Sequence, residues 1–397
     1  MVKVCFISPE YLPLSGGTGA YVYYLSKELM KHGNSAYIVT GYGESRDVKV
    51  NPQHYVFFLK TLKAPVVKSF LFAASASRKL SKIIGSLPVD FAHVNLPLVP
   101  SFAVPRGFGK TLISTVHSTW KGEAEAIRGE PYSRLNSNEK FMVSFNWFLR
   151  IFEEKMLERS DKIIAVSDFT RRELLQYYKV KEDKIRVIHN GVDVDKFQPV
   201  RDKRKAKEEL GFNPDDIAVL SVGRLYARKG LFTLLESMPR VVRKFRNAKF
   251  IISGKGQSNE MKKLVNHATR LGVKDNIIFT GYFPDSKLPK LYQAADVFAF
   301  STFYENLPFA VLEALSSGLP VVTTKVGGIP EMIESGRNGF LVQPSNAREL
   351  ADRILYCLEH PAAASEMAVL ARKTILKRFD WSLIVKKVLA VYYEALS

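Results

Sequence analysis

Short apolar runs that alternate with helical patterns constrain the fold of this chain more than any other feature. The runs are rich in Val, Ile and Phe, and most are followed by a stretch of helical periodicity. Alternation of this kind predicts α/β domains with doubly wound parallel sheets. Two series of strands are predicted, over 3–8, 36–40, 56–59, 91–95, 111–116, 162–166 and 185–188, and over 218–222, 249–253, 276–280, 297–300, 320–324 and 339–342.

The length of 397 residues is enough for two domains of ordinary size. A charged segment that contains a proline, over 198–207, separates the two series of strands and is interpreted as a linker. We therefore predict one Rossmann-like domain over 1–198 and a second over 199–379. A last helical pattern follows Trp381 and runs to residue 396.

Composition narrows the class of protein. The net charge of +19 is spread over both halves, so phosphate-bearing substrates and anionic membranes are possible partners. No RNP pattern, zinc spacing or basic zipper is present, and a nucleic-acid partner is not expected. Cys5 and Cys357 lie in apolar runs and are interpreted as core residues of a reducing compartment. The first seven residues fit a strand better than a signal peptide, and no apolar run has the length of a bilayer span, so a cytoplasmic location is expected.

Two carboxylates follow the predicted strand at 297–300. Glu305 is expected in the loop after this strand, and Glu313 in the helix that the loop feeds. Asn306 is interpreted as the N-cap, with Pro308 near the helix start. Loops at the carboxyl ends of parallel strands bind ligands, so this pair is predicted to hold two parts of one long ligand. The alternative for such a pair alone is a solvated helix face.

Two cations follow the first strand of the second series. Arg224 and Lys229 precede a predicted helix. Positive charge at a helix start is unfavourable because it opposes the helix dipole, so a functional role for the two cations is considered. Cations placed there would stabilise negative charge on a bound group. The alternative is a pair of ordinary surface charges.

Two features of the first series are also candidates. Gly16 and Gly17 precede a helix, where glycine lets backbone N–H groups approach a phosphate. This loop is not a dinucleotide-binding fingerprint, and a structural turn explains it about as well. His117 follows the strand at 111–116, and a structural role is the alternative there.

Taken together, these motifs resemble the signature of family 4 retaining nucleotide-sugar glycosyltransferases. The resemblance is carried by Glu305-x7-Glu313, by the run 314–322 and by Gly327-Gly-Ile-Pro-Glu331. It implies the GT-B fold, in which two Rossmann-like domains face a central cleft. It also implies an N-terminal acceptor-side domain, a C-terminal donor-binding domain, and a terminal helix over 380–397 that packs back on the first domain.

The resemblance further implies roles for individual residues. Glu305 and His117 would contact the donor sugar, Glu313 the ribose, and Arg224 and Lys229 the diphosphate. The remaining donor contacts implied are Gly16, Gly17, Phe283, Asn306, Leu307 and Phe309. Many members carry Gly-Phe-Gly after the first Glu. This chain has Asn306-Leu307-Pro308, and Pro308 has no N–H to donate.

The resemblance implies hexose transfer from a nucleotide-diphosphate sugar to an acceptor hydroxyl on a glycan, lipid or small molecule. A UDP-sugar is favoured, with GDP-mannose next. No cofactor and no metal are expected. Asp193-Val-Asp195 matches a metal-binding D-x-D pattern but is interpreted as a turn. The alternatives are a nucleotide-sugar epimerase of the same fold and a non-catalytic nucleotide-sugar or membrane-binding protein.

A membrane-facing helix is a separate hypothesis. Residues 48–89 contain no acidic residue and seven basic ones. On a helix near 66–84, Lys68, Phe72, Lys79 and Lys82 share one side. A Phe among lysines suits an anionic membrane surface, so a peripheral position on the inner face of the membrane is predicted. The aromatic-rich helix near 141–156 is a weaker candidate for a lipid or acceptor groove. A solvated helix face is the alternative.

Overall fold

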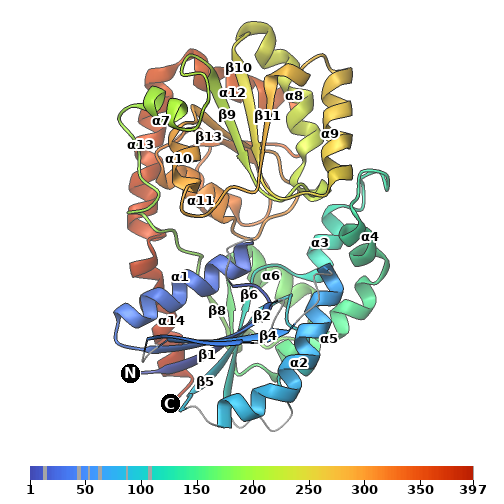
Figure 1. Cartoon of the computed structure of the whole chain (residues 1–397), viewed down its shortest axis with the longest axis vertical. Helices are drawn as coiled ribbons and strands as arrows, with labels where there is room; N and C mark the ends of the chain where they lie inside the picture. Colours follow the sequence, from blue (N-terminus) through green and yellow to red (C-terminus); the bar gives the residue numbers. More distant parts are fainter. Residues whose placement is uncertain are drawn as a thin grey trace. The chain divides into compact units, whose positions relative to one another are not determined.

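The computed structural model describes residues 1–11, 16–42, 46–51, 54–60, 65–85, 88–105 and 110–396. The chain forms two compact units (Figure 1). Unit 1 comprises Met1–Glu125, Lys140–Asn190 and Trp381–Ser397, and unit 2 comprises Ala126–Glu139 and Gly191–Asp380. The main boundary thus lies at 190/191, whereas the sequence analysis placed it at 198/199.

Unit 1 is built on an eight-stranded sheet with the order β3-β4-β2-β1-β5-β6-β7-β8. Its pairings are parallel except for β3 with β4, so the predicted parallel sheet is confirmed. β3 was not predicted, because its charged and polar residues suit an edge strand and not the apolar pattern of a buried one. The strands are β1 (Lys3–Ser8), β2 (Ser35–Tyr42), β3 (Arg46–Asn51), β4 (His54–Lys60), β5 (Phe91–Leu96), β6 (Thr111–Val116), β7 (Lys162–Ala165) and β8 (Ile185–Val187).

The helices of this half follow the strands and cover the sheet. Apolar residues of α2 pack with those of the central strands in one core, which includes Ile7, Phe72, Leu80 and Val94. The helices are α1 (Gly17–Lys31), α2 (Pro65–Gly85), α3 (Trp120–Ala126), α4 (Ser137–Ser144), α5 (Asn146–Arg159), α6 (Asp168–Tyr177) and the last helix, α14 (Trp381–Glu394). Two of them, α3 and α4, extend across the unit boundaries at 125/126 and 139/140.

A buried histidine ties α14 to the sheet of unit 1. His93 on β5 forms a 2.6 Å hydrogen bond with the hydroxyl of Tyr392 and a 2.7 Å bond with Thr115 on β6. Trp381, at the start of α14, is buried against Tyr21 and Tyr24 of α1. Because Tyr392 and Trp381 are both buried, the last helix is an integral part of this unit's core.

Unit 2 is built on a six-stranded parallel sheet with the order β11-β10-β9-β12-β13-β14. The strands are β9 (Ile217–Val222), β10 (Ala248–Ser253), β11 (Ile277–Gly281), β12 (Val297–Phe300), β13 (Val321–Thr324) and β14 (Phe340–Val342). The helices are α7 (Lys203–Glu209), α8 (Leu231–Lys244), α9 (Ser258–Arg270), α10 (Leu288–Gln293), α11 (Phe309–Ser316), α12 (Ala347–Glu359) and α13 (Pro361–Arg378).

The predicted linker over 198–207 is partly structured. α7 begins inside it, with Asp202 as a side-chain N-cap. The Lys207 side chain is buried and donates to Asp296 at 2.8 Å and to the carbonyl of Asp216 at 2.6 Å. A lysine-rich sequence was interpreted as solvated linker, but a paired lysine can be buried in a fold.

Three smaller predictions can be compared with the structure. Cys5 and Cys357 are both buried and unbridged, as predicted. Asp193 accepts a 3.0 Å bond from the N–H of Lys196, which confirms the predicted turn. Within the described residues, no helix is long and apolar enough to cross a membrane.

Candidate active site in unit 2

The candidate site lies where the strand order of the second sheet reverses. β9 lies between β10 and β12, so the chain leaves this point in opposite directions along the sheet. The loop after β9 carries Lys229, and the loop after β12 carries Glu305. In open α/β sheets, ligands bind outside the carboxyl ends of strands at this switch point.

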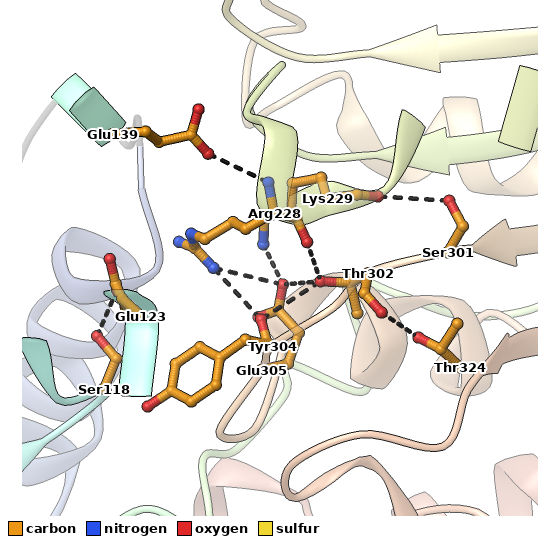
Figure 2. Close-up of polar contacts among 10 residues, drawn as sticks. All are labelled: Ser118, Glu123, Glu139, Arg228, Lys229, Ser301, Thr302, Tyr304, Glu305 and Thr324. Carbon is orange, nitrogen blue, oxygen red and sulfur yellow. Dashed lines mark hydrogen bonds and ion pairs between the residues drawn. The ribbon is translucent and has the colours of Figure 1, made fainter. Parts of the chain in front are cut away.

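A buried ion pair joins these two loops. Lys229 Nζ donates to Glu305 Oε1, and the two side chains are only 12% and 11% exposed (Figure 2). The guanidinium of Arg228 lies 3.8 Å from the same carboxylate oxygen, and it donates to the carbonyl of Tyr304 at 3.4 Å. Two cations and one carboxylate therefore share a partly dehydrated place, where electrostatic interactions are stronger than in water.

Hydrogen bonds lock the β9 and β12 loops together. Ser301 Oγ donates to the carbonyl of Gly230 at 2.7 Å, and Thr302 Oγ1 donates to the carbonyl of Arg228 at 3.0 Å. Gly230 has φ +62, and a Cβ there would lie 1.9 Å from the carbonyl oxygen of Ser301. Only glycine fits this contact, so the position of Lys229 relative to β12 is fixed by backbone packing.

Gly327 and Gly328 pack against the main chain of Glu305. Gly328 N–H donates to the Glu305 carbonyl at 3.0 Å. A Cβ on Gly327, which has φ +57, would lie 1.7 Å from the same oxygen. The glycines therefore hold the main chain of Glu305, which gives a physical reason for one motif of the family resemblance.

Glu313 lies in a different polar contact from Glu305. It is buried on α11, and its Oε2 accepts from the hydroxyl of Tyr292 at 2.7 Å. Burial raises the pKa of Glu313 to about 7, although the bond from Tyr292 acts in the opposite direction. The two carboxylates of the motif thus have different partners. Glu305 lies beside two cations, whereas Glu313 is hydrogen-bonded to a neutral phenol.

The start of α11 differs from the prediction. Pro308, and not Asn306, is at the N-cap position, and no side chain caps this helix end. The helix begins at Phe309, so Glu313 is its fifth residue. The residue before a proline is disfavoured from helical backbone angles, so Leu307 is a poor first helical residue. A helix capped by Asn306 would need Leu307 in that position.

The other predicted donor contacts occupy loops of the same unit. The Arg224 guanidinium lies 5.9 Å from the ring centre of Tyr226 in the β9 loop. Phe283 follows β11 and is half-buried. Asn306 and Leu307 are buried, and Phe309 is half-buried. Of the predicted residues, the structure thus joins Lys229 directly to Glu305, with Arg228 as an unpredicted third member.

A second residue that sequence reasoning missed is Glu139. Its Oε2 accepts from the N–H of Ala227 at 3.2 Å. Its Oε1 accepts from the N–H of Arg228 at 3.1 Å, the contact that Figure 2 shows. Glu139 belongs to the segment Ala126–Glu139, which is part of unit 2 although the flanking chain is in unit 1. Asn136-x-x-Glu139 fits a capping box, a signal that predicts a helix start but not this long-range contact.

Candidate residues of unit 1 lie at the carboxyl ends of its strands. Gly17 is the first residue of α1, and Gly16 precedes it with no side-chain cap. His117 follows β6, and its Nε2 lies 3.0 Å from Oδ1 of Asn95. Burial lowers the pKa of His117 to about 3, so its imidazole is neutral near pH 7 and is a weak proton acceptor.

The predicted membrane face of α2 needs a correction. Phe72 is fully buried in the core of unit 1, because residues 72, 76 and 80 form the stripe that faces the sheet. Lys79 and Lys82 are exposed, as the hypothesis requires. The Lys68 side chain lies outside the described residues. The aromatic therefore does not share the exposed face with the lysines.

Two family models match the chain. The model of glycosyl transferases group 1 matches residues 202–374, and the model of glycosyltransferase family 4 matches residues 15–196. The chain belongs to the family 4-type glycosyltransferases. It is therefore a transferase enzyme, and each of its two halves carries one of the two family domains.

Similarity to known proteins covers the full length. An uncharacterized glycosyltransferase of Methanocaldococcus jannaschii is 26% identical over 100% of this chain and 99% of its own. A glycogen synthase of Mycobacterium tuberculosis is 25% identical over 99% of this chain and 95% of its own.

Solved structures show the same GT-B fold. A sucrose-phosphate synthase from Thermosynechococcus elongatus has a TM-score of 0.83 at 22% identity, covering 100% of this chain and 99% of its own. HepE of Anabaena, in complex with UDP and glucose, has a TM-score of 0.75 at 21% identity, covering 98% of this chain and 99% of its own. The predicted two-domain architecture is thereby confirmed.

The role of Glu139 is open to a direct test. We expect Glu139→Ala to raise amide hydrogen exchange in the peptide that contains Ala227 and Arg228, since both N–H groups lose their acceptor. A lost hydrogen bond of this kind predicts about tenfold faster exchange. Glu139→Gln keeps one acceptor oxygen, so the increase in hydrogen exchange should be smaller than in Glu139→Ala.

The matched control is Glu334→Ala, which removes an exposed carboxylate of the same unit that pairs with Arg337 at 2.8 Å. Its peptide around residue 227 should exchange as in the wild type. Equal exchange in both alanine variants would show that Glu139 does not hold this loop.

Proposed function

We propose that this enzyme transfers a hexose, with retention of anomeric configuration, from a nucleotide-diphosphate sugar to an acceptor hydroxyl. A UDP-sugar is the favoured donor and GDP-mannose the next. The acceptor is a glycan or a lipid-linked molecule. The observation that carries the proposal is the buried cluster of Lys229, Arg228 and Glu305 at the switch point of the second sheet.

The cluster supplies the charge that this reaction needs. When the bond from the sugar to the diphosphate breaks, negative charge grows on the leaving phosphate. Lys229 and Arg228 stabilise that charge, and Arg224 in the same loop adds a guanidinium. Because the locked loops fix Lys229 in advance, little reorganisation is needed during the reaction. Glu305 holds the ammonium in place until the donor arrives and then contacts the sugar hydroxyls.

The remaining roles follow the family pattern. Glu313 accepts hydrogen bonds from the ribose, and His117 contacts the donor sugar as a neutral imidazole. Departing phosphate, not His117, takes the acceptor proton, which agrees with the low pKa of this histidine. No metal takes part in this scheme, since two or three side-chain cations balance the diphosphate.

The anomeric configuration of the first product, measured by NMR, tests retention.

Lys229 gives the sharpest test of the donor site. We expect Lys229→Met to weaken UDP binding about tenfold to a hundredfold, the value of a charged hydrogen bond to phosphate. It also leaves Glu305 buried without its ammonium, which predicts a loss of about 3 kcal/mol of stability. Isothermal titration calorimetry with UDP and thermal unfolding measure the two effects.

A double variant separates binding from stability. Lys229→Met with Glu305→Gln removes both charges, so stability should recover while UDP binding stays weak. Lys244→Met is the control, because this lysine pairs with Glu359 at the surface of α8 and α12. If the double variant binds UDP as the wild type does, the proposed diphosphate site is wrong.

Glu313 predicts a pH dependence of nucleoside binding. Its raised pKa of about 7 means that it ionises in the neutral range. Ribose hydroxyls donate to a carboxylate better than to a neutral acid, so affinity for uridine should rise as the pH goes from 6 to 8, by about three- to tenfold. Uridine is used in place of UDP because it has no phosphate whose own titration would change the affinity over this pH range. Glu313→Gln should bind with no such rise, and a rise that persists in this variant would assign it to another group.

We further propose that the exposed basic face of α2 binds an anionic membrane surface. Arg78, Lys79 and Lys82 are exposed there, and residues 48–89 contain no acid. We expect the protein to sediment with phosphatidylglycerol vesicles at low salt, and Lys79→Glu with Lys82→Glu to abolish this. Arg240→Glu with Lys244→Glu, on α8, is the matched control. Unchanged sedimentation of the α2 variant would remove this face from the proposal.

A further inference from the structure

Tyr292 on α10 is a fully buried residue whose hydroxyl reaches the candidate site in unit 2. The hydroxyl donates to Oε2 of Glu313 at 2.7 Å and lies 3.4 Å from the carbonyl oxygen of Ala310. The shorter contact is made with the carboxylate, which is the stronger acceptor. Burial and the neighbouring Glu313 raise the pKa of the Tyr292 phenol well above its usual range, so the phenol keeps its proton and remains a donor at neutral pH.

The hydrogen bond from Tyr292 leaves one oxygen of Glu313 for a ligand. Oε1 makes no hydrogen bond with the described residues, and Glu313 keeps 9% of its surface exposed. The last torsion of a glutamate side chain has broad minima, so the carboxyl group has no strong orientation of its own. A short bond to Oε2 fixes the plane of this group and thereby the direction in which Oε1 points.

The ring of Tyr292 is itself held by the segment that precedes α7. Phe197 is buried and meets the ring edge-on, with 5.7 Å between the ring centres. The carbonyl of Phe197 accepts from the guanidinium of Arg372 and from the hydroxyl of Ser316, each at 2.6 Å. Ser316 lies on α11, the helix that carries Glu313. One carbonyl therefore anchors both the packing partner of Tyr292 and the helix of the carboxylate.

Two charged side chains also act on Glu313. Burial raises the pKa of Glu313 to about 7, and the bond from Tyr292 lowers it. The negative charge of Asp285 raises this pKa further, and the positive charge of Lys196 lowers it, both by less than the first two causes. Asp285 and Lys196 form an ion pair with each other, so their effects on Glu313 partly cancel.

We propose that Tyr292 is a positioning residue for the nucleoside, because it holds Oε2 of Glu313 and so directs Oε1 to a ribose hydroxyl. Tyr292 itself does not touch the ligand. Without its hydroxyl, the carboxyl group can turn, and it loses a donor that favours the ionised form. Both changes make Glu313 a poorer acceptor for ribose. This inference rests on the proposed function, since it concerns the ribose contact of the same donor.

The main test is Tyr292→Phe, which removes only the hydroxyl and keeps the ring against Phe197. We expect uridine to bind about tenfold more weakly at pH 7, because Glu313 is less well oriented and less ionised. Binding of 2′,3′-dideoxyuridine, which lacks both ribose hydroxyls, should stay within about twofold of the wild type. Ligand-observed NMR titrations measure both dissociation constants. A loss of general packing would weaken both ligands equally.

The pH profile gives a second measurement with opposite signs in two variants. In Tyr292→Phe the rise in uridine affinity should move to higher pH, because the lost bond favoured the ionised Glu313. In Asp285→Asn it should move to lower pH, because a neighbouring negative charge is removed. NMR of the ¹³C-labelled carboxyl group of Glu313, identified with Glu313→Gln, follows the same ionisation with no ligand present.

The matched control is Tyr356→Phe, which removes the hydroxyl of a partly exposed tyrosine on α12 of the same unit. It should bind uridine with the affinity and pH profile of the wild type. Melting curves identify any variant that fails to fold. If Tyr292→Phe does not fold, Phe197→Leu tests the same point, since it loosens the ring of Tyr292 and should weaken uridine but not 2′,3′-dideoxyuridine.

Two results would overturn the inference. The first is a Tyr292→Phe protein that loses affinity for uridine and 2′,3′-dideoxyuridine to the same extent, which would show a merely structural role. The second is a Tyr292→Phe protein in which Glu313 ionises and uridine binds as in the wild type. A wild type that binds neither uridine nor UDP would contradict the proposed function instead, while the carboxyl NMR signal would still show whether Tyr292 holds Glu313.

Discussion

The structure of unit 2 depends on the buried pair of Lys229 and Glu305. Both side chains are mostly shielded from solvent, and an ion pair in such a place is stable only when its geometry is fixed. Three contacts fix the main chain around the pair: Gly230 packs on the Ser301 carbonyl, the Thr302 hydroxyl donates to the Arg228 carbonyl, and the Gly328 N–H donates to the Glu305 carbonyl. The glycines of the family motif are thus requirements of this packing.

The β9 loop also depends on a residue far away in the sequence. Glu139 accepts from two successive N–H groups in the loop that carries Arg228 and Lys229. The segment that brings Glu139 there is further held by Arg134, whose guanidinium lies 4.3 Å from the ring of Phe232 on α8. A part of the chain that belongs to the N-terminal family domain by sequence therefore supports the cations of the second unit.

Burial shifts the pKa of ionisable side chains in both units. In unit 1, His93 and His117 have pKa values near 3 and Glu153 has a pKa near 8, so all three are predominantly neutral at pH 7. In unit 2, burial raises the pKa of Glu313 to about 7, and Lys229, Arg228 and Glu305 lie together at the switch point. On the proposed function, the cations at the switch point suit a diphosphate, which needs positive charge close to it.

The sequence by itself determined the two parallel sheets, the Glu305 loop after β12, the cation-bearing loop after β9 and the core positions of Cys5 and Cys357, because apolar periodicity and strand-end motifs are local signals. It did not determine the edge strand β3, the burial of Phe72, the assignment of 126–139 to unit 2 or the pairing of Glu139 and Arg228 with the site. β3 pairs only with the neighbouring β4 and lacks the apolar pattern of a buried strand, whereas the other three depend on contacts between residues far apart in the chain. Charge and aromatic content along one helix say which residues share a face, and only tertiary packing decides which face is turned to the sheet.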